Sequence, residues 1–312
     1  MNVRSVRAPL RIGTRGSALA LAQATAVASM LRAHGHEVEV VPMRTEGDRL
    51  ASARLAAVGG KGLFVREIED ALLARSIDVA VHSLKDLPAE LPDGLVLAAF
   101  PPREDPRDVL VARRPGGLDA MPAGAVVGTS SPRRRALVLA ARPDLAVEPL
   151  RGNVDTRLRK LESGECEATV LAAAGLKRLG VAPPHTSALP VESFVPAVGQ
   201  GTLGLEARED DAHMRAALAP LDDRTTHACA AAERAFLARL GASCVTPVAA
   251  HASMDGDTLT MHAIVVSEDG RRILRERGSA APVDAEALGR TLADGLLGQG
   301  AATMVALTPR ER

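Results

Sequence analysis

The chain has 312 residues, equal numbers of basic and acidic residues (38 of each), 46% hydrophobic residues and 1% aromatic residues. This length predicts two or three domains, and the apolar content excludes a disordered chain. The balanced charge argues against a nucleic-acid coat or a polybasic membrane binder, and the scarcity of aromatics argues against base stacking. Lysine accounts for only four of the 38 basic residues, so arginine supplies most of the positive charge.

The cysteines and the apolar runs point to a reducing cytoplasm. The three cysteines, Cys166, Cys229 and Cys244, lie far apart and form no C-x-x-C pair, which argues against a disulfide framework or a cysteine zinc site. No signal-peptide core follows the N-terminal arginines, and no apolar run is long enough to span a bilayer. We therefore expect a cytoplasmic protein that contacts neither membrane nor nucleic acid.

Strand-like and helix-like segments alternate over the first hundred residues, as in an α/β layer structure. Ser17 is placed to cap the first helix and Gly35 to end it. The polar, glycine-bearing stretch 45–62 predicts a loop. The predicted strands are 9–14, 37–43, 77–81 and 95–100, and the predicted helices are 18–32 and 64–75.

A second α/β unit begins near Asp108. Its residues 127–132 repeat the order of 12–17, namely a strand, Gly-Thr, a hydroxyl residue and a helix start, so we expect two similar α/β domains facing a cleft. Ser131 followed by proline is typical of a helix N-terminus. The predicted strands are 125–128, 145–150 and 168–171, and the predicted helices are 132–141 and 155–162.

The last ninety residues differ in pattern. A helix over 225–240 precedes two Asp-Gly hairpin signals at 255–256 and 269–270, and a final helix covers 284–297. This order predicts a small α+β domain. The proline-rich stretch 100–102 and residues 220–224 are candidate domain boundaries.

Hydroxyl and cationic side chains follow the predicted strands at the edge where α/β sheets bind ligands. With helix N-termini nearby, they predict a site for an anion, either a polycarboxylate or a phosphate. We interpret Arg113 and Arg142 instead as solvated surface groups. The strand-end residues are Thr14, Arg15, Ser17, Ser83, Lys85, Asp86, Thr129, Ser130, Ser131, Arg133, Arg134, Arg151, Asn153 and Arg157.

Two further side chains, Asp86 and Cys244, each allow two interpretations of their role. Asp86 is a lone carboxylate among cations, which either stabilises a cation that forms on a substrate or caps a turn before Pro88. Cys244 lies in a helix-to-strand loop, as either a reactive thiol or a small buried hydrophobe. His82 ends a buried strand and is expected to be structural, and no histidine spacing favours a metal site or a Ser/His/Asp triad.

Seven motifs occur together in one order. They are Arg15-Gly-Ser-Ala-Leu-Ala, Gly60-Lys-Gly-Leu-Phe, His82-Ser-Leu-Lys-Asp-Leu-Pro, Arg103-Glu-Asp-Pro-Arg-Asp, Gly128-Thr-Ser-Ser-Pro-Arg-Arg, Arg151-Gly-Asn-Val-Asp-Thr-Arg-Leu-Arg-Lys-Leu and Pro196-Ala-Val-Gly-Gln-Gly. The ordered set, from about residue 11 to 247, resembles the porphobilinogen deaminase (hydroxymethylbilane synthase) family.

The resemblance implies an enzyme of tetrapyrrole biosynthesis. The family joins four porphobilinogen molecules head to tail, releases ammonia at each step and forms hydroxymethylbilane. Its primer is a dipyrromethane cofactor held by a thioether to one cysteine, which here corresponds to Cys244, after the Glu-Arg-x-Phe-Leu helix at 233–237. The family usually has Gly-Gly before that cysteine, whereas this chain has Ala242-Ser243.

The resemblance also implies roles for particular residues. Asp86 corresponds to the catalytic aspartate, Lys61, Phe64 and Gln200 are lid or supporting residues, and 47–61 forms a lid. The residues implied to bind the carboxylates of substrate and cofactor are Arg15, Ser17, Lys85, Thr129, Ser131, Arg133, Arg134, Arg151, Arg157 and Arg178.

The family fold implies two periplasmic-binding-protein-like α/β domains around a cleft and a small C-terminal α+β domain. The implied boundaries are 1–101 with 200–219 returning, 105–196, and 222–312 with the cofactor cysteine. We expect a monomer without metal. The alternative from the residues alone is a non-catalytic organic-anion binder of the same two-lobed fold, and the third region with Cys244 counts against it.

Overall fold

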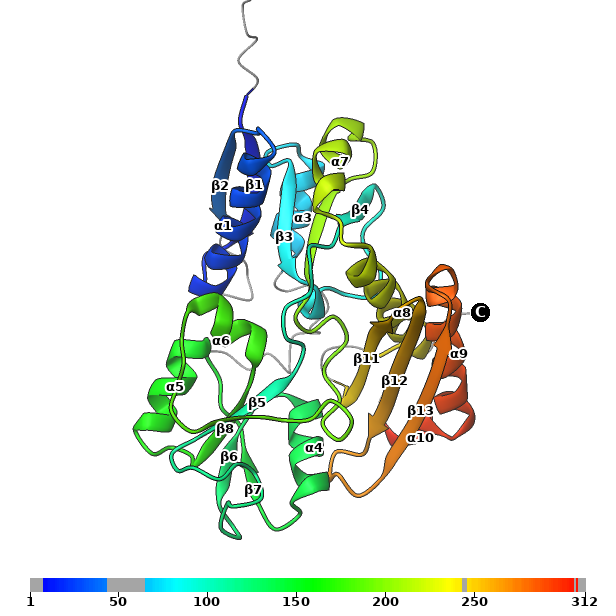
Figure 1. The fold of residues 1–312 in the computed structure, drawn as a ribbon. Helices are drawn as coiled ribbons and strands as arrows, with labels where there is room; N and C mark the ends of the chain where they lie inside the picture. The colour runs from blue at the N-terminus through cyan, green and yellow to red at the C-terminus, as the bar shows by residue number, and fades with distance from the viewer. Residues whose placement is uncertain (1–7, 44–64, 243–245, 306, 308–312) are drawn as a thin grey trace, which may run out of the picture. The chain divides into compact units, whose positions relative to one another are not determined.

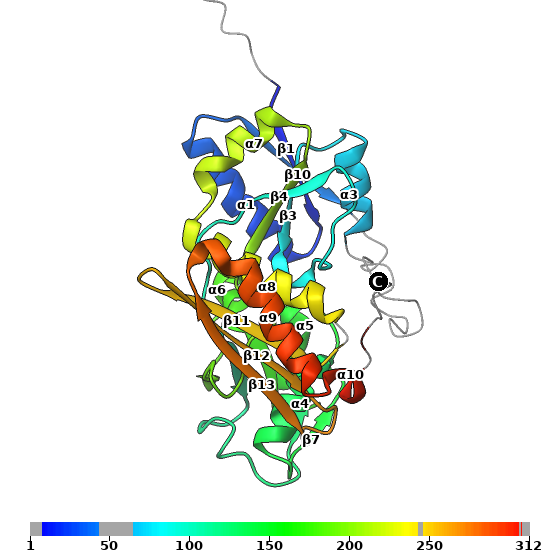
Figure 2. The same ribbon diagram turned by 90° about the vertical axis from the view of Figure 1, so that its right-hand side faces the viewer.

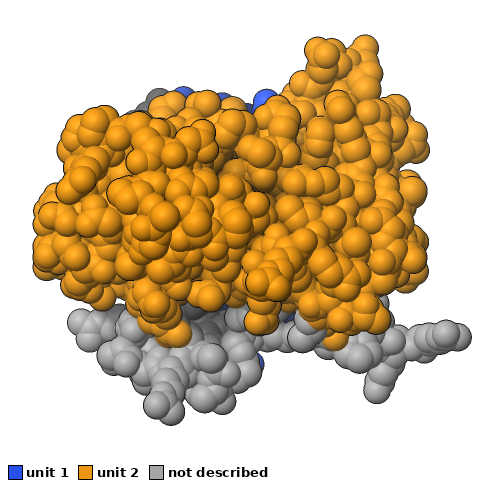
Figure 3. All heavy atoms as spheres, turned by 90° about the horizontal axis from the view of Figure 1, so that it is seen from below, with its two compact units in different colours: residues 1–83, 91–101, 203–223 blue, residues 84–90, 102–202, 224–312 orange. Residues whose placement is uncertain are grey.

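The structure, a computed structural model, describes residues 8–43, 65–242, 246–305 and 307. The chain divides into two compact units, which Figure 3 colours separately. Unit 1 comprises Met1–Ser83, Leu91–Pro101 and Leu203–Asp223, and unit 2 comprises Leu84–Glu90, Pro102–Thr202 and Arg224–Arg312. Within the described ranges, no helix combines the length and the apolar character that a membrane crossing requires.

Unit 1 is built on a five-stranded sheet with the order β2-β1-β3-β10-β4 (Figure 1). Strand β1 runs parallel to β2 and β3, whereas β10 lies antiparallel between β3 and β4. The strands are β1 (Leu10–Arg15), β2 (Val38–Met43), β3 (Val79–Ser83), β4 (Leu95–Ala99) and β10 (Leu203–Arg208), and the helices are α1 (Ala18–Ala33), α3 (Arg66–Leu73), α7 (Ala212–Leu218) and the 3₁₀ turn η4 (Ala219–Leu221).

Unit 2 contains a second five-stranded sheet, with the order β7-β6-β8-β5-β9. Its strands are β5 (Asp108–Ala112), β6 (Val126–Gly128), β7 (Ala146–Glu148), β8 (Ala168–Ala172) and β9 (Thr186–Ala188). Its helices are α4 (Pro132–Ala141), α5 (Val154–Glu162), α6 (Ala173–Leu179) and the 3₁₀ turn η3 (Leu84–Asp86).

The two five-stranded sheets share one topology. In the second sheet β6 runs parallel to β7 and β8, and β5 lies antiparallel between β8 and β9, as β10 does between β3 and β4 in the first. The repeat expected from residues 12–17 and 127–132 is therefore confirmed. In both sheets the strand after the first helix is parallel. The antiparallel strand of the first sheet, β10, comes from a distant part of the chain, whereas that of the second, β5, directly precedes β6.

Both predicted serine caps are confirmed. Ser17 Oγ accepts a hydrogen bond from the backbone N–H of Ala20 at 3.3 Å, and Ser131 Oγ accepts one from Arg134 at 3.4 Å. Each serine has extended backbone angles, as an N-cap residue requires, and satisfies a donor that the first helical turn leaves open. The helices therefore begin where the sequence predicted.

The C-terminal part of unit 2 is a three-stranded antiparallel sheet with the order β11-β12-β13, covered by two helices (Figure 2). Both Asp-Gly hairpins form, with Gly256 and Gly270 at positive φ. The elements are α8 (Arg224–Leu240), β11 (Val248–Asp255), β12 (Thr258–Val266), β13 (Ile273–Ala280), η5 (Pro282–Asp284), α9 (Ala285–Gly298) and α10 (Ala301–Met304).

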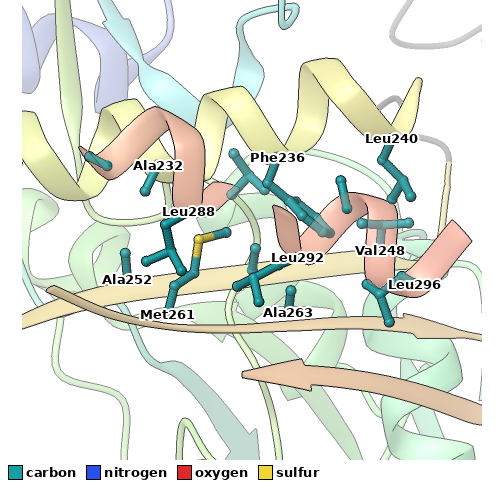
Figure 4. Packing of buried hydrophobic residues seen from close by; sticks show 14 of the residues in the cluster. Ala232, Phe236, Leu240, Val248, Ala252, Met261, Ala263, Leu288, Leu292 and Leu296 are labelled. Atoms are coloured by element: carbon teal, nitrogen blue, oxygen red, sulfur yellow. The ribbon is translucent and has the colours of Figure 1, made fainter. Parts of the chain in front are cut away.

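Alternation along β12 gives this small sheet two buried faces. Met261, Ala263 and Val265 pack with Phe236 of α8 and the leucines of α9, as Figure 4 shows for part of the cluster. Ile264 and Val266 point the other way, into the core that contains α4. Since successive strand residues face opposite sides, a single strand contributes to both cores. The predicted α/β architecture with a small C-terminal α+β region is confirmed.

One surface interpretation is wrong. Arg142 ends α4, and its guanidinium donates to the carbonyl oxygens of Leu118 and Met121 at 2.7 and 2.8 Å and pairs with Asp144 at 2.6 Å. Its side chain is only 18% exposed. The sequence carries no local sign of this role, because the carbonyl groups lie more than twenty positions earlier. Arg113, by contrast, is exposed and pairs with Glu167, as expected.

Candidate active site

A buried carboxylate organises the cations of unit 2. Asp108 begins β5, is fully buried and contacts two arginines from the first turn of α4. Arg134 donates to its Oδ1 through Nε and Nη2 at 3.0 and 2.7 Å, and Nη1 of Arg133 lies 2.7 Å from its Oδ2. Burial by itself raises the pKa of Asp108, but the charges of Arg133 and Arg134 outweigh it and lower the pKa. Asp108 is therefore ionised.

Gln200 links this carboxylate to a lysine. Its side-chain Nε2 donates to the carbonyl oxygen of Pro106 at 2.8 Å and to Oδ1 of Asp108 at 3.1 Å. Its Oε1 accepts a hydrogen bond from Nζ of Lys85 at 3.3 Å. The buried amide therefore uses both ends, and it fixes the side chain of Lys85 relative to the arginine pair.

Lys85 and Asp86 form the short turn η3 directly after β3. Lys85 is half-buried, whereas Asp86 is exposed. Burial and the charge of Arg134 together lower the pKa of Lys85 to about 8, while Asp86 and Asp108 oppose the shift. Lys85 is thus poised to gain or lose its charge near neutral pH, and Asp86 is accessible to a ligand.

Arg157 extends the cluster from α5. Its Nε donates to the carbonyl oxygen of Gly152 at 2.8 Å, in the turn where Gly152 has a φ of +118°. Burial and the charge of Arg134 lower the pKa of Arg157 to about 10, and Asp86 opposes this shift. Arg157, Arg134 and Asp86 are therefore close enough to influence one another. In α6, Arg178 donates to the carbonyl oxygen of Gly201 at 2.6 Å, and burial lowers its pKa.

The cluster carries more positive than negative charge. Among the described residues, the carboxylates that act on Lys85, Arg133, Arg134 and Arg157 are Asp86 and Asp108. Partly buried cations attract anions strongly, because water screens them less than it screens surface charges. The described side chains can therefore bind a ligand with several carboxylates beside an accessible aspartate.

The predicted hydroxyl residues serve first as acceptors within the fold. Oγ1 of Thr129 accepts a hydrogen bond from the backbone N–H of Ser131 at 3.2 Å, and the cap interactions of Ser17 and Ser131 are given above. An accepting hydroxyl still has its own proton to donate. Capping by these residues is thus compatible with donation to a ligand carboxylate.

The structure brings together only part of the predicted set. Arg15 and Ser17 belong to unit 1, and Arg151 is exposed in the turn before α5. Cys244, Lys61 and Phe64 lie outside the described residues. Their roles stay predictions.

A second buried carboxylate was missed by the sequence interpretation. Glu233 of α8 is fully buried and pairs with Arg103 Nη1 at 2.7 Å. It also accepts backbone hydrogen bonds from Gly199 at 2.6 Å and Ala252 at 2.8 Å. Burial raises the pKa of Glu233, but Arg103 and His251 outweigh it and lower the pKa to about 2. A single glutamate in an otherwise alanine-rich helical stretch was the available signal.

Asp108 was missed as well, although it stands in the 103–108 motif directly before a run of buried apolar residues. The expectation for His82 is confirmed, because its Nε2 lies 3.0 Å from the buried Oε2 of Glu206. In the described part of the chain, no group of three or more His, Cys, Asp or Glu side chains is arranged to hold a metal ion.

Comparisons with known proteins agree with the motifs. The family described as "Porphobilinogen deaminase, dipyromethane cofactor binding domain" matches residues 10–216, and "Porphobilinogen deaminase, C-terminal domain" matches residues 227–298. A porphobilinogen deaminase of Syntrophobacter fumaroxidans is 49% identical over 94% of this chain and 95% of its own length. One from Acidithiobacillus ferrooxidans is 51% identical over 95% of this chain and 97% of its own length.

Among solved structures, a putative methionine-binding lipoprotein from Bacillus subtilis covers 68% of this chain and 89% of its own, with 11% identity and a TM-score of 0.43. A substrate-binding protein of an ABC transporter from Coxiella burnetii covers 68% and 91%, with 15% identity and a TM-score of 0.42. The two matched domains together span most of the chain, and the curated relatives are matched over nearly their whole length. The chain belongs to the porphobilinogen deaminase family.

Proposed function

We propose that this protein joins four porphobilinogen molecules head to tail, with loss of ammonia at each step, and releases hydroxymethylbilane. The observation that carries this proposal is the exposed carboxylate of Asp86 beside Lys85, Arg134 and Arg157. An accessible anion within a surplus of cations suits a substrate that presents carboxylates at its rim and develops positive charge at its centre.

The cations bind the acetate and propionate groups of the substrate. Each added pyrrole brings two carboxylates, so the growing chain needs more than one cationic contact. Arg133, Arg134, Arg157 and Lys85 supply such contacts in unit 2, and Arg15, Arg151 and Arg178 complete the set that the family motifs identify. Thr129, Ser131 and Ser17 donate their hydroxyl protons to the same carboxylates.

Asp86 acts on the reacting centre. Its carboxylate accepts hydrogen bonds from pyrrole N–H groups and stabilises the positive charge that develops on the substrate ring. The bond between the methylene carbon and the ammonium nitrogen breaks, and ammonia leaves with the bonding electron pair. The methylene carbon then forms a new carbon–carbon bond with a ring carbon of the waiting pyrrole, and that ring carbon releases its proton. The carboxylate of Asp86 favours this step by charge stabilisation.

The donor set of unit 2 fits the family's dipyrromethane cofactor, because that group also carries acetate and propionate side chains. We propose that Cys244 holds it through a thioether and that Arg133 and Arg134 bind its carboxylates. When bound, dipyrromethane supplies the pyrrole carbon to which the first substrate is joined. Burial of the arginine pair limits water around the carboxylates that these residues would bind.

The proposal includes three domains, 1–101 with 200–219, 105–196 and 222–312, supported by the three separate sheets. It also includes a cytoplasmic monomer that uses porphobilinogen and needs neither membrane nor nucleic acid. Size-exclusion chromatography with light scattering checks the monomer directly. A stable dimer would contradict that part alone.

Intact-mass spectrometry of purified protein tests the function together with its attachment residue. We expect a mass above that of the polypeptide by one dipyrromethane, and Cys244→Ser is expected to show the bare mass. A colour reaction with Ehrlich's reagent distinguishes this enzyme from an organic-anion binder, since only protein that carries pyrroles responds. Active protein with the bare polypeptide mass would refute the proposed attachment.

Asp86→Asn tests the proposed catalytic group. We expect an unchanged melting temperature, because the side chain is exposed, and a loss of turnover of about 100-fold or more. Porphobilinogen consumption is followed against wild type at equal concentrations of folded protein. Near-normal consumption by this variant would remove Asp86 from the mechanism.

A further inference from the structure

The carboxylate of Asp108 has no place in the chemistry proposed above. It is fully buried, so it cannot touch a substrate, yet it lies at the centre of the cations assigned to carboxylate binding. Its Oδ1 accepts hydrogen bonds from Arg134 and, at 3.1 Å, from Gln200, and its Oδ2 forms an ion pair with Arg133 at 2.7 Å.

Arg133 and Arg134 are adjacent in the first turn of α4. Their two positive charges repel each other, and the positive end of the helix dipole at the N-terminus disfavours cations further. Two additional carbonyl contacts, from Arg133 to Val195 and from Arg134 to Val170, orient the groups but carry no full charge. Among the described residues that contact these guanidinium groups, only Asp108 supplies a full negative charge.

The backbone of Asp108 is held firmly. It begins β5, which is paired on both sides, with β8 at Ala172 and with β9 at the next residue. Its carbonyl oxygen accepts a hydrogen bond from Leu189 at 2.9 Å. A carboxylate on a strand fixed from both sides can hold its partners in one geometry, as a preorganised site requires.

The same carboxylate reaches a third cation through Gln200, whose Oε1 accepts from Lys85. The charged groups that act on Lys85 are Arg133 and Arg134 of α4, Asp108 of β5 and Asp86 of its own turn. The two arginines make it easier for Lys85 to lose its proton, and the two carboxylates make it harder. Removal of the Asp108 charge would therefore lower the pH at which Lys85 titrates.

We propose that Asp108 is a positioning residue: its buried carboxylate fixes the guanidinium groups of Arg133 and Arg134 and, through Gln200, the ammonium group of Lys85 for binding of the substrate carboxylates. This inference rests on the proposed function, because it assigns these cations to porphobilinogen. Asp108 itself contacts neither substrate nor cofactor. A merely structural ion pair would affect folding and leave the KM for porphobilinogen unchanged.

The test compares wild type with Asp108→Asn and a matched control, Asp78→Asn. Asp78 also pairs with two arginines, Arg11 at 2.8 Å and Arg208 at 3.7 Å, but it belongs to unit 1, whereas the cation cluster belongs to unit 2. Three quantities are measured: KM and kcat for porphobilinogen, the intact mass that reports cofactor loading, and the titration of Lys85. With only four lysines in the chain, NMR of labelled lysine gives few signals, and Lys85→Arg assigns one of them.

We expect Asp108→Asn to lower kcat/KM about 100-fold, mainly through KM, and to move the Lys85 midpoint to lower pH. Asp78→Asn is expected to lower the melting temperature while KM and the Lys85 midpoint stay at wild-type values. Unchanged KM and midpoint in folded Asp108→Asn would overturn the proposal. A wild type that consumes no porphobilinogen would refute the proposed function instead, and the lysine titration, which needs no substrate, would still report on Asp108.

If Asp108→Asn does not fold, Gln200→Leu takes its place, because it keeps every charge and removes the amide that links Asp108 to Lys85, together with its hydrogen bond to the carbonyl oxygen of Pro106. Lys85 then loses a hydrogen-bond acceptor that favours its charged form. We expect a raised KM and a lower Lys85 midpoint. Wild-type values of both in this variant would overturn the proposal.

Discussion

Glu233 Oε2 accepts a 2.6 Å hydrogen bond from the backbone N–H of Gly199, one residue before the glutamine that contacts Lys85 and Asp108. The other oxygen of Glu233 pairs with Arg103, whose Nε donates to the carbonyl oxygen of Gln200 at 2.8 Å. Helix α8 is thus joined to the backbone on both sides of Gln200. The geometry of the cation cluster depends on a carboxylate far from it in the sequence.

Glu233→Ala is therefore expected to destabilise the protein by about 3 to 5 kcal/mol, because it leaves a buried arginine without its counter-ion and two backbone N–H groups without an acceptor. Urea unfolding measures this change. The control is Arg239→Ala on the same helix, where an exposed pair with Asp294 is expected to contribute no more than about 1 kcal/mol. Equal losses in the two variants would contradict the prediction.

Gly199 and Gly201 test the tightness of the same turn. Both have positive φ, a β-carbon at Gly199 would lie 2.8 Å from Cγ of Leu84, and one at Gly201 would overlap the carbonyl oxygen of Glu104. We expect alanine at either position to cost roughly 1 to 3 kcal/mol beyond the backbone strain. Gly180→Ala measures that strain alone, since its φ is +66° and nothing lies within 4 Å. Equal melting temperatures for the three alanine variants would rule out the steric cost.

Buried Glu69 is expected to make the stability of the protein depend on pH in an unusual direction. Burial and the neighbouring Glu206 raise the pKa of Glu69 from 4.5 to about 7, while His82 opposes the shift. Between these values the folded chain holds a proton that the unfolded chain has lost, so stability falls as the pH rises from about 4.5 to about 7. The total loss should be roughly 3 kcal/mol.

Glu69→Gln is expected to abolish this part of the decline, because glutamine does not titrate. Urea unfolding at several pH values measures the slope. Glu37→Gln changes an exposed carboxylate elsewhere in unit 1 and should keep the wild-type slope. A glutamine variant that follows the wild-type curve would show that Glu69 does not hold the proton.

Ser131 allows helix capping to be separated from ligand binding. Ser131→Ala removes the acceptor for the N–H of Arg134 and is expected to cost about 1 kcal/mol. Ser131→Asp restores a good cap, but it places a negative charge beside the arginine pair. We therefore expect near-wild-type stability with a clearly raised KM for porphobilinogen. An unchanged KM in the aspartate variant would mean that the substrate carboxylates bind elsewhere.

The sequence predicted what short-range chemistry determines. Ser17 and Ser131 cap helices through groups three residues away, and both Asp-Gly hairpins lie within single turns. It did not predict the partners of Asp108 or Glu233, because the contacts of Glu233 join positions up to 130 residues apart. A carboxylate's charge is visible in the sequence, but whether it faces water, an arginine or a backbone amide depends on packing between distant elements.

Packing between distant elements also decides the roles of individual arginines, which the sequence therefore predicted only in part. The positions of Lys85, Arg133, Arg134 and Arg157 after predicted strands indicated that these cations lie near one another. Their charges do act on one another in the structure. The pattern could not show that Arg133 and Arg134 are already bound to an internal carboxylate, nor that Arg142 holds a loop. Arginine donates in five directions, so one side chain can serve the fold and a ligand together, and only geometry divides these roles.

The position of β10 has a consequence for synthesis of the chain. This strand lies between β3 and β4, yet it follows β4 by about 100 residues, and β4 has no other partner strand in the described part of the protein. At about 5 to 20 residues per second, the ribosome needs roughly 5 to 20 s to deliver it. For that interval the nascent sheet presents open strand edges, which favour intermolecular pairing. Unit 1 therefore completes its fold only after most of the second sheet has emerged, and slow translation prolongs its exposure to aggregation.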